Sequence, residues 1–387
     1  MQSMKTFLKE NIDEISTPAY YFDFEEFKNR AMLVKDALGM IPLTYSVKAN
    51  PFLLAELPEA IDRVEACSPG ELAVCIRNGI SSERIIYSGV NKEIEDVEDA
   101  LGYRVGIVSI ESIKQLECVQ YIADKKGIKQ KIFIRLTSGN QFGMAENELL
   151  KILSEIDNYS NIIFCGIHYY SGTQKSIKQL NEELDYLSDF FYTVKQQTGY
   201  TPEILEYGPG LRVDYFGNVG RNSEMDYFRS AVALITDFSS KYHIGIEVGR
   251  FLAASCGIYA TRIKDIKVNN GINYAICDGG IHQIKYYGQN HAMQIPRLEV
   301  LKCEDNKDFY CVCGSLCTVA DVLIRKVELP ILELNDVLLF GKCGAYSVTE
   351  GMALFLSRDF PEVYLFTKKR ELLKSRERIS TYEFNTI

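Results

Sequence analysis

Short strand-like segments alternate with longer helix-like segments from about residue 25 to about residue 255. The helix-like segments are charged and amphipathic, and the clearest lie at 24–38, 110–123, 146–155 and 176–196. The strand-like segments are rich in β-branched residues and lie at 43–47, 63–65, 84–87, 106–108, 131–135, 162–169, 204–207 and 243–247. Eight or so strands, each followed by a helix within roughly 220 residues, predict an α/β fold, a (β/α)8 TIM-like barrel.

The pattern changes after about residue 257. Closely spaced β-branched runs follow, at 257–268, 274–277, 298–300, 308–312, 337–340 and 362–366, with few helical stretches. This spacing predicts an all-β second domain, a C-terminal β-sandwich or small β-barrel. Residues 17–22 are also strand-like, and we expect them to pair with this domain. The predicted domains are therefore a cofactor-binding barrel at 24–255 and a β-domain made of 1–23 and 256–387.

Composition restricts the class of ligand. The 387 residues are 47% hydrophobic, enough for a sizeable core, and carry a net charge of -9. That charge gives no electrostatic footprint for nucleic acid, and no Lys/Arg block suggests binding to an anionic membrane surface. We find neither the apolar core of a signal peptide nor an apolar run of transmembrane length. A cytoplasmic protein that binds small molecules is expected.

Eleven cysteines are scattered along the chain without a regular framework. In a long chain this distribution favours free thiols over disulfides. Cys311 and Cys313, followed by Cys317, suggest zinc, but no second Cys/His pair at zinc-finger spacing follows them. We therefore predict no metal site.

Residues 45–50 read Tyr-Ser-Val-Lys-Ala-Asn and place Lys48 at the end of an apolar strand, just before Pro51. A lysine held there can lose its hydration and its proton, and can then attack an aldehyde. Most lysines that follow a strand are solvated surface residues. The rest of the chain decides between these readings.

The last two strand-to-helix loops of such a barrel often bind phosphate. Gly208 and Gly210 follow the seventh strand, where their N–H groups are available to an oxyanion. Glu247, Gly249 and Arg250 follow the eighth, where the guanidinium suits a phosphate. Either loop alone is an ordinary turn. Together with Lys48 they describe a site for pyridoxal 5'-phosphate, in which Glu247 pairs with the protonated ring nitrogen.

The chain resembles the fold-type III pyridoxal-phosphate-dependent decarboxylases, the family of diaminopimelate and ornithine decarboxylases, over nearly its whole length. The matching segments occur in the family's order, at 45–50, 64–72, 166–174, 208–210, 247–250, 313–321 and 344–346. The resemblance implies that Lys48 carries the cofactor and that Glu65 lies near it. It also implies that Thr173 and Tyr346 contact the phosphate. By the same resemblance, Cys317 enters the active site of a partner subunit, so that a homodimer shares its sites.

Two departures concern the cofactor. The family's stacking histidine aligns with Tyr170, while His168 lies two residues earlier and on the same side of the strand. We expect Tyr170 to stack on the cofactor and His168 to lie near the substrate, unless His168 is a satisfied core imidazole. The usual Gly-Gly-Gly has become Gly208-Pro209-Gly210, which removes one N–H donor and shifts phosphate contacts to the two glycines and Thr173.

Other departures concern the substrate. Diaminopimelate and ornithine decarboxylases have an acidic residue after the catalytic cysteine, which binds a distal ammonium, whereas this chain has Thr318. The Arg-Pro segment of diaminopimelate enzymes is missing after Asp278; His282 and Lys285 there favour a polar or anionic tail, or are ordinary surface residues. The pattern is closer to secondary-metabolite and siderophore branches, whose amino acid is attached to a carrier or a larger acid. The predicted substrate-binding residues are His168, Asp278, Thr318 and Asp321.

The predicted function is decarboxylation of an amino acid or of a substrate derived from one. Cys317, or water beside it, returns a proton to Cα, although a free core cysteine is the alternative. Diaminopimelate decarboxylase itself is one rival. An amino-acid racemase is another, but a racemase needs an acid/base pair on two faces and usually carries a tyrosine from the β-domain. A regulatory binding protein generally has lesions in the cofactor site, and Lys48, Glu247, Arg250 and Cys317 are all present.

Overall fold

The computed structural model describes residues 2–217, 221–301 and 306–387. The chain divides into two compact units, which we treat separately. The barrel unit consists of Arg30–Val213 and Arg221–Leu252, and the β-unit of Met1–Asn29, Asp214–Gly220 and Ala253–Ile387.

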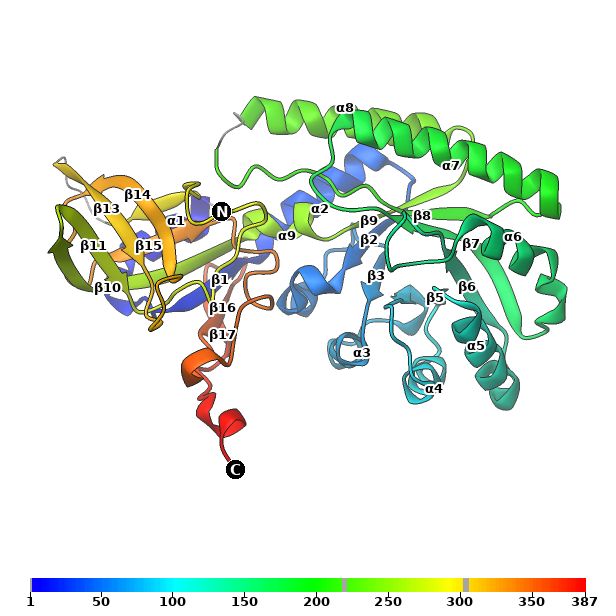
Figure 1. Ribbon diagram of the computed structural model, residues 1–387, viewed down its shortest axis with the longest axis horizontal. Coiled ribbons are helices and arrows are strands. Elements are labelled where there is room, and N and C mark those ends of the chain that lie inside the picture. The colour runs from blue at the N-terminus through cyan, green and yellow to red at the C-terminus, as the bar shows by residue number, and fades with distance from the viewer. Residues whose placement is uncertain (1, 218–220, 302–305) are drawn as a thin grey trace. The chain divides into compact units, whose positions relative to one another are not determined.

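The barrel unit contains a closed barrel of parallel strands in the order β2 to β9 (Figure 1). The strands are β2 (Leu43–Ser46), β3 (Arg63–Ala66), β4 (Ile85–Tyr87), β5 (Ile107–Ile110), β6 (Gln130–Arg135), β7 (Ile162–Tyr170), β8 (Ile204–Gly208) and β9 (Ile244–Val248). Each strand pairs with its sequence neighbour, and β2 pairs with β9 to close the ring. The predicted (β/α)8 barrel is confirmed.

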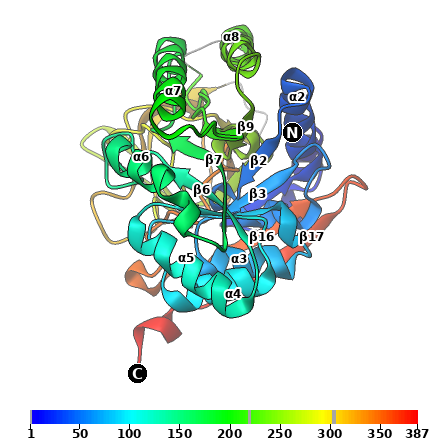
Figure 2. The same ribbon diagram turned by 90° about the vertical axis from the view of Figure 1, so that its right-hand side faces the viewer.

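Helices lie between the strands and outside them, as Figure 2 shows for α5, α6 and α7. They are α3 (Pro69–Arg77), α4 (Ile94–Tyr103), α5 (Ile113–Lys126), α6 (Glu146–Ser154), α7 (Ile177–Thr198) and α8 (Arg221–Ser239), while α2 (Phe24–Leu38) and α9 (Arg250–Ala253) cross the unit boundary. The segment expected at 110–123 becomes helical only at Ile113, because the Ser112 side chain caps the first turn by accepting from Gln115 N. Ser176 caps α7 in the same way and forms a capping box with Gln179.

The β-unit is built on a nine-stranded sheet with the path β14-β13-β11-β10-β1-β16-β17, to which β15 and β12 are added beside β10. The strands are β1 (Ala19–Asp23), β10 (Gly257–Asn269), β11 (Ile272–Cys277), β12 (Leu298–Val300), β13 (Lys307–Cys313), β14 (Val322–Pro330), β15 (Val337–Gly341), β16 (Glu362–Phe366) and β17 (Leu372–Arg376). The long β10 pairs with β1 and β15 along its first half and with β11 along its second. Strand β10 thereby joins the group that contains β1 and β15 to the group that contains β11, as in the expected sandwich.

The expected return of the N-terminal strand is confirmed, because β1 pairs antiparallel with β10 and parallel with β16. Helix α1 (Gln2–Glu10) was not expected; its apolar side chains join the core of the β-unit. Strands β14 and β17 were also not expected, because charged residues such as Arg325, Lys326 and Lys374 interrupt their apolar pattern. The buried members of this core are Met4, Leu8, Ile15, Ala19, Tyr21, Ile258, Ala260, Leu301, Val337, Leu339 and Phe366.

Ten cysteines lie in the described residues, and all ten are free thiols, as expected. Cys303 lies outside the described residues. Among the helices of residues 2–217, 221–301 and 306–387, none has the length and apolar character that crossing a membrane requires.

Candidate active site

Lys48 lies in a short 3-10 turn, Val47–Ala49, directly after β2. Its Nζ is 2.7 Å from Glu65 Oε2 and 3.7 Å from Glu247 Oε1. Both carboxylates are buried, whereas the Lys48 side chain is 38% exposed. The amine is therefore fixed between two buried charges and still open to a small molecule.

The electrostatics keep Glu65 ionised. Burial by itself raises the pKa of this carboxyl, but the neighbouring Lys48 ammonium and His168 outweigh that effect and hold the pKa well below its usual range. Ser88 Oγ also donates to Glu65 Oε1, at 2.5 Å. A carboxylate is thus present next to the amine at any pH near neutrality.

Glu247 is oriented by two neighbours at the end of β9. Ser46 Oγ donates to Glu247 Oε1 at 2.8 Å, and His168 Nε2 lies 3.1 Å from Glu247 Oε2. On its other side, the His168 ring nitrogen Nδ1 is hydrogen-bonded to Ser109 Oγ at 2.9 Å. His168 therefore lies against the carboxylate, with its ring held by a hydroxyl from β5.

The phosphate loops approach each other closely. Gly210 has φ of +57°, a conformation that favours glycine, and an added Cβ would collide with Gly172 O. A Cβ on Gly208 would lie 2.5 Å from the Tyr170 ring, and one on Gly249 would lie 3.0 Å from Ala49 Cβ. An added side chain would strain the Gly210 backbone and would crowd Tyr170 at Gly208 and Ala49 at Gly249, so at these glycines the backbone itself lines the ends of β8 and β9.

The loop that carries Thr173 is tied down by a buried ionic group that we did not anticipate. Glu183 of α7 accepts hydrogen bonds from Lys175 Nζ and from Tyr207 Oη, both at 2.7 Å, and from Ser171 Oγ. Lys175 N also donates to Gly210 O at 3.2 Å. The loops after β7 and β8 are thereby held together.

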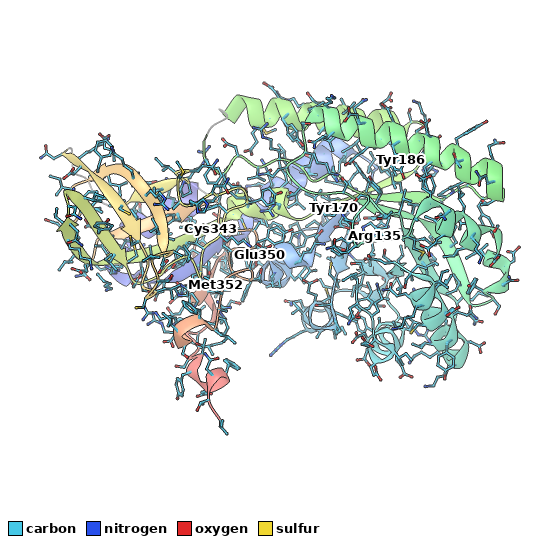
Figure 3. The ribbon with its side chains drawn as sticks, viewed as in Figure 1. Arg135, Tyr170, Tyr186, Cys343, Glu350 and Met352 are labelled. Atoms are coloured by element: carbon cyan, nitrogen blue, oxygen red, sulfur yellow. The ribbon has the colours of Figure 1, made fainter. Side chains whose placement is uncertain are left out.

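A second unanticipated ion pair lies at the ends of β5 and β6. Arg135 Nη1 donates to Glu111 Oε1 at 2.8 Å, and Gly143 N donates to Glu111 Oε2 at 2.9 Å. Figure 3 labels Arg135 and Tyr170, both from the barrel unit. A sequence signal exists for the charged residues Glu111 and Arg135, because both lie at or just beyond strand ends, where barrel sites form.

Three predicted residues of the β-unit, Cys317, Thr318 and Asp321, lie on the loop between β13 and β14. Cys317 is exposed, Thr318 is partly buried and Val319 is 100% exposed. Asp321 is buried below them; its carboxylate accepts from Leu316 N at 2.7 Å and Ile281 N at 2.8 Å. Asp321 thus fixes the loop that presents Cys317 and Thr318.

Asp278 is held inside the β-unit, where it accepts hydrogen bonds from Thr17 Oγ1 and Thr261 Oγ1, both at 2.7 Å. Tyr346 has φ of +67°, an uncommon conformation for a non-glycine residue. Its carbonyl accepts from Thr349 N and Glu350 N. These contacts fix both residues in position within this unit.

The two polar residues after Asp278 differ from each other. His282 is buried, and burial together with the Arg358 charge lowers its pKa to about 4, so it is neutral near pH 7. Lys285 is exposed and lies 3.2 Å from Glu350. Lys285, not His282, therefore offers a positive charge to a ligand.

The barrel unit fits pyridoxal phosphate. The group needs an amine for its aldehyde, a carboxylate for its ring nitrogen and a cradle for its phosphate. Glu247 Oε2 is buried and accepts no hydrogen bond among the described residues, where its polar neighbour is His168 Nε2 at 3.1 Å, so this oxygen is available to a protonated ring nitrogen. Glu65, His168 and Glu247 also present ligand atoms within 4.8 Å of one another, a donor set that suits a metal ion, but the Lys48 ammonium already balances the carboxylates.

Comparison with known proteins agrees with this fit. The family model described as the pyridoxal binding domain of pyridoxal-dependent decarboxylases matches residues 24–254. The chain is 28% identical to an L-glutamyl-[BtrI acyl-carrier protein] decarboxylase of Niallia circulans, over 77% of this chain and 76% of the relative. It is 25% identical to the 2-[(L-alanin-3-ylcarbamoyl)methyl]-2-hydroxybutanedioate decarboxylase of Staphylococcus aureus, over 91% and 94%.

Diaminopimelate decarboxylases are similar as well. The chain is 25% identical to the Aquifex aeolicus enzyme, over 96% of this chain and 91% of that enzyme. The fold matches the crystal structure of the Helicobacter pylori enzyme complexed with L-lysine, with a TM-score of 0.84, 23% identity and 97% coverage of both chains. The chain therefore belongs to the pyridoxal-dependent decarboxylases, which makes it a carboxy-lyase with pyridoxal phosphate as its cofactor.

Proposed function

We propose that this enzyme decarboxylates an α-amino acid whose side chain is joined to a larger acyl or amide group. The observation that carries the substrate class is Thr318, a neutral residue next to the exposed Cys317. A site without a carboxylate there lacks the partner that a distal ammonium requires. The relatives from Niallia circulans and Staphylococcus aureus support this class, because both are named for conjugated substrates.

Diaminopimelate decarboxylation is the weaker alternative. Relatives with that name are 22% to 25% identical to this chain. Against it stand Thr318 and the missing Arg-Pro segment: residues 281–289 contain no arginine or proline, but do contain Tyr286 and Tyr287. Tyr286 is buried and donates to Gly341 O at 2.8 Å, so it does not replace a guanidinium.

Pyridoxal phosphate, when bound, supplies an aldehyde that bonds an amine and a ring that takes up the electron pair left by departing carbon dioxide. We propose that Lys48 provides the resident amine, which Glu65 holds in place. Glu247 retains a proton at the ring nitrogen, and His168 and Ser46 orient that carboxylate.

The remaining cofactor contacts are assigned by position. Tyr170 would stack on the cofactor ring, and the phosphate would be held by backbone N–H groups of Gly208, Gly210 and Gly249 and by side chains of Thr173, Arg250 and Tyr346. The Lys175–Glu183 ion pair and the hydrogen bond from Lys175 N to Gly210 O keep the Thr173 and Gly210 loops in place. Among substrate-binding residues, Thr318 and His168 face the substrate, while Asp278 and Asp321 support the segments that bind it.

We propose a homodimer in which Cys317 of the partner subunit returns the proton to Cα. The exposed loop that carries this thiol supports the proposal, as do exposed apolar side chains on the same unit: Val319 at 100%, Met293 at 72% and Met352 at 51%. Figure 3 labels Met352 beside Glu350 on the β-unit. In this arrangement, the barrel at 24–255 binds the cofactor, and the β-domain at 1–23 and 256–387 forms the dimer. The free thiols support a cytoplasmic location.

The decisive experiment measures carbon dioxide release from purified enzyme loaded with pyridoxal phosphate. The substrates are a γ-acyl conjugate of L-glutamate, a side-chain amide of 2,3-diaminopropionate, meso-diaminopimelate and L-ornithine. We expect a conjugate to react with a kcat/KM at least about tenfold above that of either diamine. A preference for diaminopimelate would refute the substrate class, and racemisation without carbon dioxide would refute the reaction.

A further inference from the structure

A pocket of about 300 Å³ lies beside the Cys317 loop within the β-unit. It is bounded on one side by the loop residues Val319 and Ala320 and on the other by the segment that follows Gly280. The complete lining is Ile281, Ile284, Lys285, Tyr286, Gln289, His291, Ala292, Val319, Ala320, Val322 and Arg325. Val319, which lines the pocket, follows the proposed proton donor Cys317 by two positions in the sequence.

The charged side chains that line this pocket, among the described residues, are positive. Lys285 and Arg325 are cations, and no aspartate or glutamate is among the described residues that line it. Lys285 Nζ lies 3.2 Å from Glu350 Oε2, a carboxylate outside the lining; because both side chains are exposed and the pair is weak, an anionic ligand can compete for the lysine. Arg325 Nε donates to His291 O at 2.6 Å, which fixes the guanidinium at the rim.

Below the rim, the wall combines apolar side chains with polar groups such as Gln289 and His291. Ile284 and Tyr286 are buried, and Tyr286 is anchored by its hydrogen bond to Gly341 O. A pocket with a mixed polar and apolar wall and two cations suits a polar, uncharged linker that ends in an anion. A distal ammonium is excluded, because the rim cations repel it and Thr318 offers no carboxylate.

We propose that this pocket binds the anionic end of the substrate's side-chain conjugate. The anion is a carboxylate of a small conjugating acid or the phosphate diester of a carrier's prosthetic arm, and the same two cations suit both. This inference rests on the proposed function, since it assigns the tail of a conjugated substrate. It makes Lys285 and Arg325 specificity-determining residues.

The kinetic test compares two substrates that differ only in the tail: a side-chain amide ending in a carboxylate, and its methyl ester. In Lys285→Met and Arg325→Met, the ratio of KM for the acid to KM for the ester rises about tenfold in each variant. The matched control is Lys326→Met, because Lys326 is the exposed neighbour of Arg325 and does not line the pocket. An unchanged ratio in the pocket variants, or the same rise in the control, overturns the proposal. A phosphopantetheine thioester tested alongside identifies the source of the anion, and a loss with either anionic substrate supports the pocket.

A second test needs no turnover. Cys317 is the exposed thiol among the ten described cysteines, so its alkylation by iodoacetamide can be followed in the holoenzyme by mass spectrometry. Citrate, used as a polycarboxylate probe, slows this alkylation at least about threefold, and the protection disappears in Lys285→Met. Protection without decarboxylation of any conjugate supports the pocket and refutes the proposed function. An equal alkylation rate with and without citrate overturns the pocket.

Discussion

The barrel unit and the β-unit hold their functional side chains in opposite ways. In the barrel unit, Glu65, His168 and Glu247 are buried, and they contact one another or Lys48 directly. In the β-unit, Cys317 and Val319 stand exposed on a loop, and only the supporting Asp321 is buried.

The difference separates two kinds of constraint. In the barrel each buried charge depends on the others, because removing one leaves its partner buried and unbalanced. Thr318 lies partly buried on a loop and balances no buried charge, so it can differ from the family's acidic residue without disturbing the fold. The residues proposed for cofactor chemistry are therefore constrained by burial, whereas the residue proposed for substrate choice lies on a loop where substitutions disturb the fold less.

The largest expected effect tests the barrel half of this comparison. Lys48→Ala lowers kcat at least about 1000-fold, because it removes the only amine placed between Glu65 and Glu247 in the described residues. The visible absorption band of lysine-bound cofactor disappears as well. Lys114→Ala, an exposed lysine on α5, serves as the control and keeps both band and activity. A Lys48→Ala protein that retains the band would refute the assignment.

Glu247→Gln is expected to lower kcat between about 100- and 1000-fold, because a neutral amide does not stabilise the positive charge of a protonated ring nitrogen. The matched control is Glu206→Gln. Glu206 is another buried barrel carboxylate, paired with Arg63 at 3.0 Å. Its loss lowers the free energy of unfolding by about 3 kcal/mol and leaves kcat within about twofold. Equal kcat losses in the two variants would mean that any buried barrel carboxylate affects kcat, and that the position of Glu247 next to Lys48 is not the cause.

Cys317→Ala tests the β-unit half. We expect kcat to fall by about 10- to 100-fold, with cofactor absorbance retained, because water beside the loop takes over part of the proton transfer. A 1:1 mixture of Lys48→Ala and Cys317→Ala chains, dissociated and reassembled at random, recovers roughly a quarter of wild-type activity if each site combines residues of two chains. Mixtures that stay inactive would show that each chain holds a complete site.

The smallest expected effect concerns a buried group of the β-unit. An unfolded histidine binds its proton near pH 6.5, whereas burial lowers the pKa of His282 in the folded chain to about 4. Between these values the unfolded state binds more protons, so the free energy of unfolding falls as the pH falls, by at most about 3 kcal/mol. Urea unfolding at pH 7 and pH 4 measures this loss, and His282→Gln should reduce it. An unchanged loss in that variant would place the acid sensitivity elsewhere.

Much of the site could be predicted because a parallel barrel brings the carboxyl ends of all its strands to one face. Lys48, Glu65 and Glu247 lie at or just after the ends of three different strands. They meet because β2 pairs in parallel with both β3 and β9. The hydroxyls of Ser46 and Ser109 were missed, since a serine near a strand end has no pattern that distinguishes it from an ordinary turn residue. The Lys175–Glu183 pair was missed because its partners lie on a loop and a helix with no fixed spacing.

The sequence by itself determined the alternation of strands and helices, the return of β1 to the second domain and the order of the motifs, because these depend on periodicity and on glycines where only backbone fits. Tertiary structure alone decided which charges meet. It placed His168 against Glu247, buried His282 while leaving Lys285 exposed, and set Asp321 beneath the Cys317 loop. Burial and pairing are properties of neighbours distant in the chain, and a residue's own position in the sequence does not specify them.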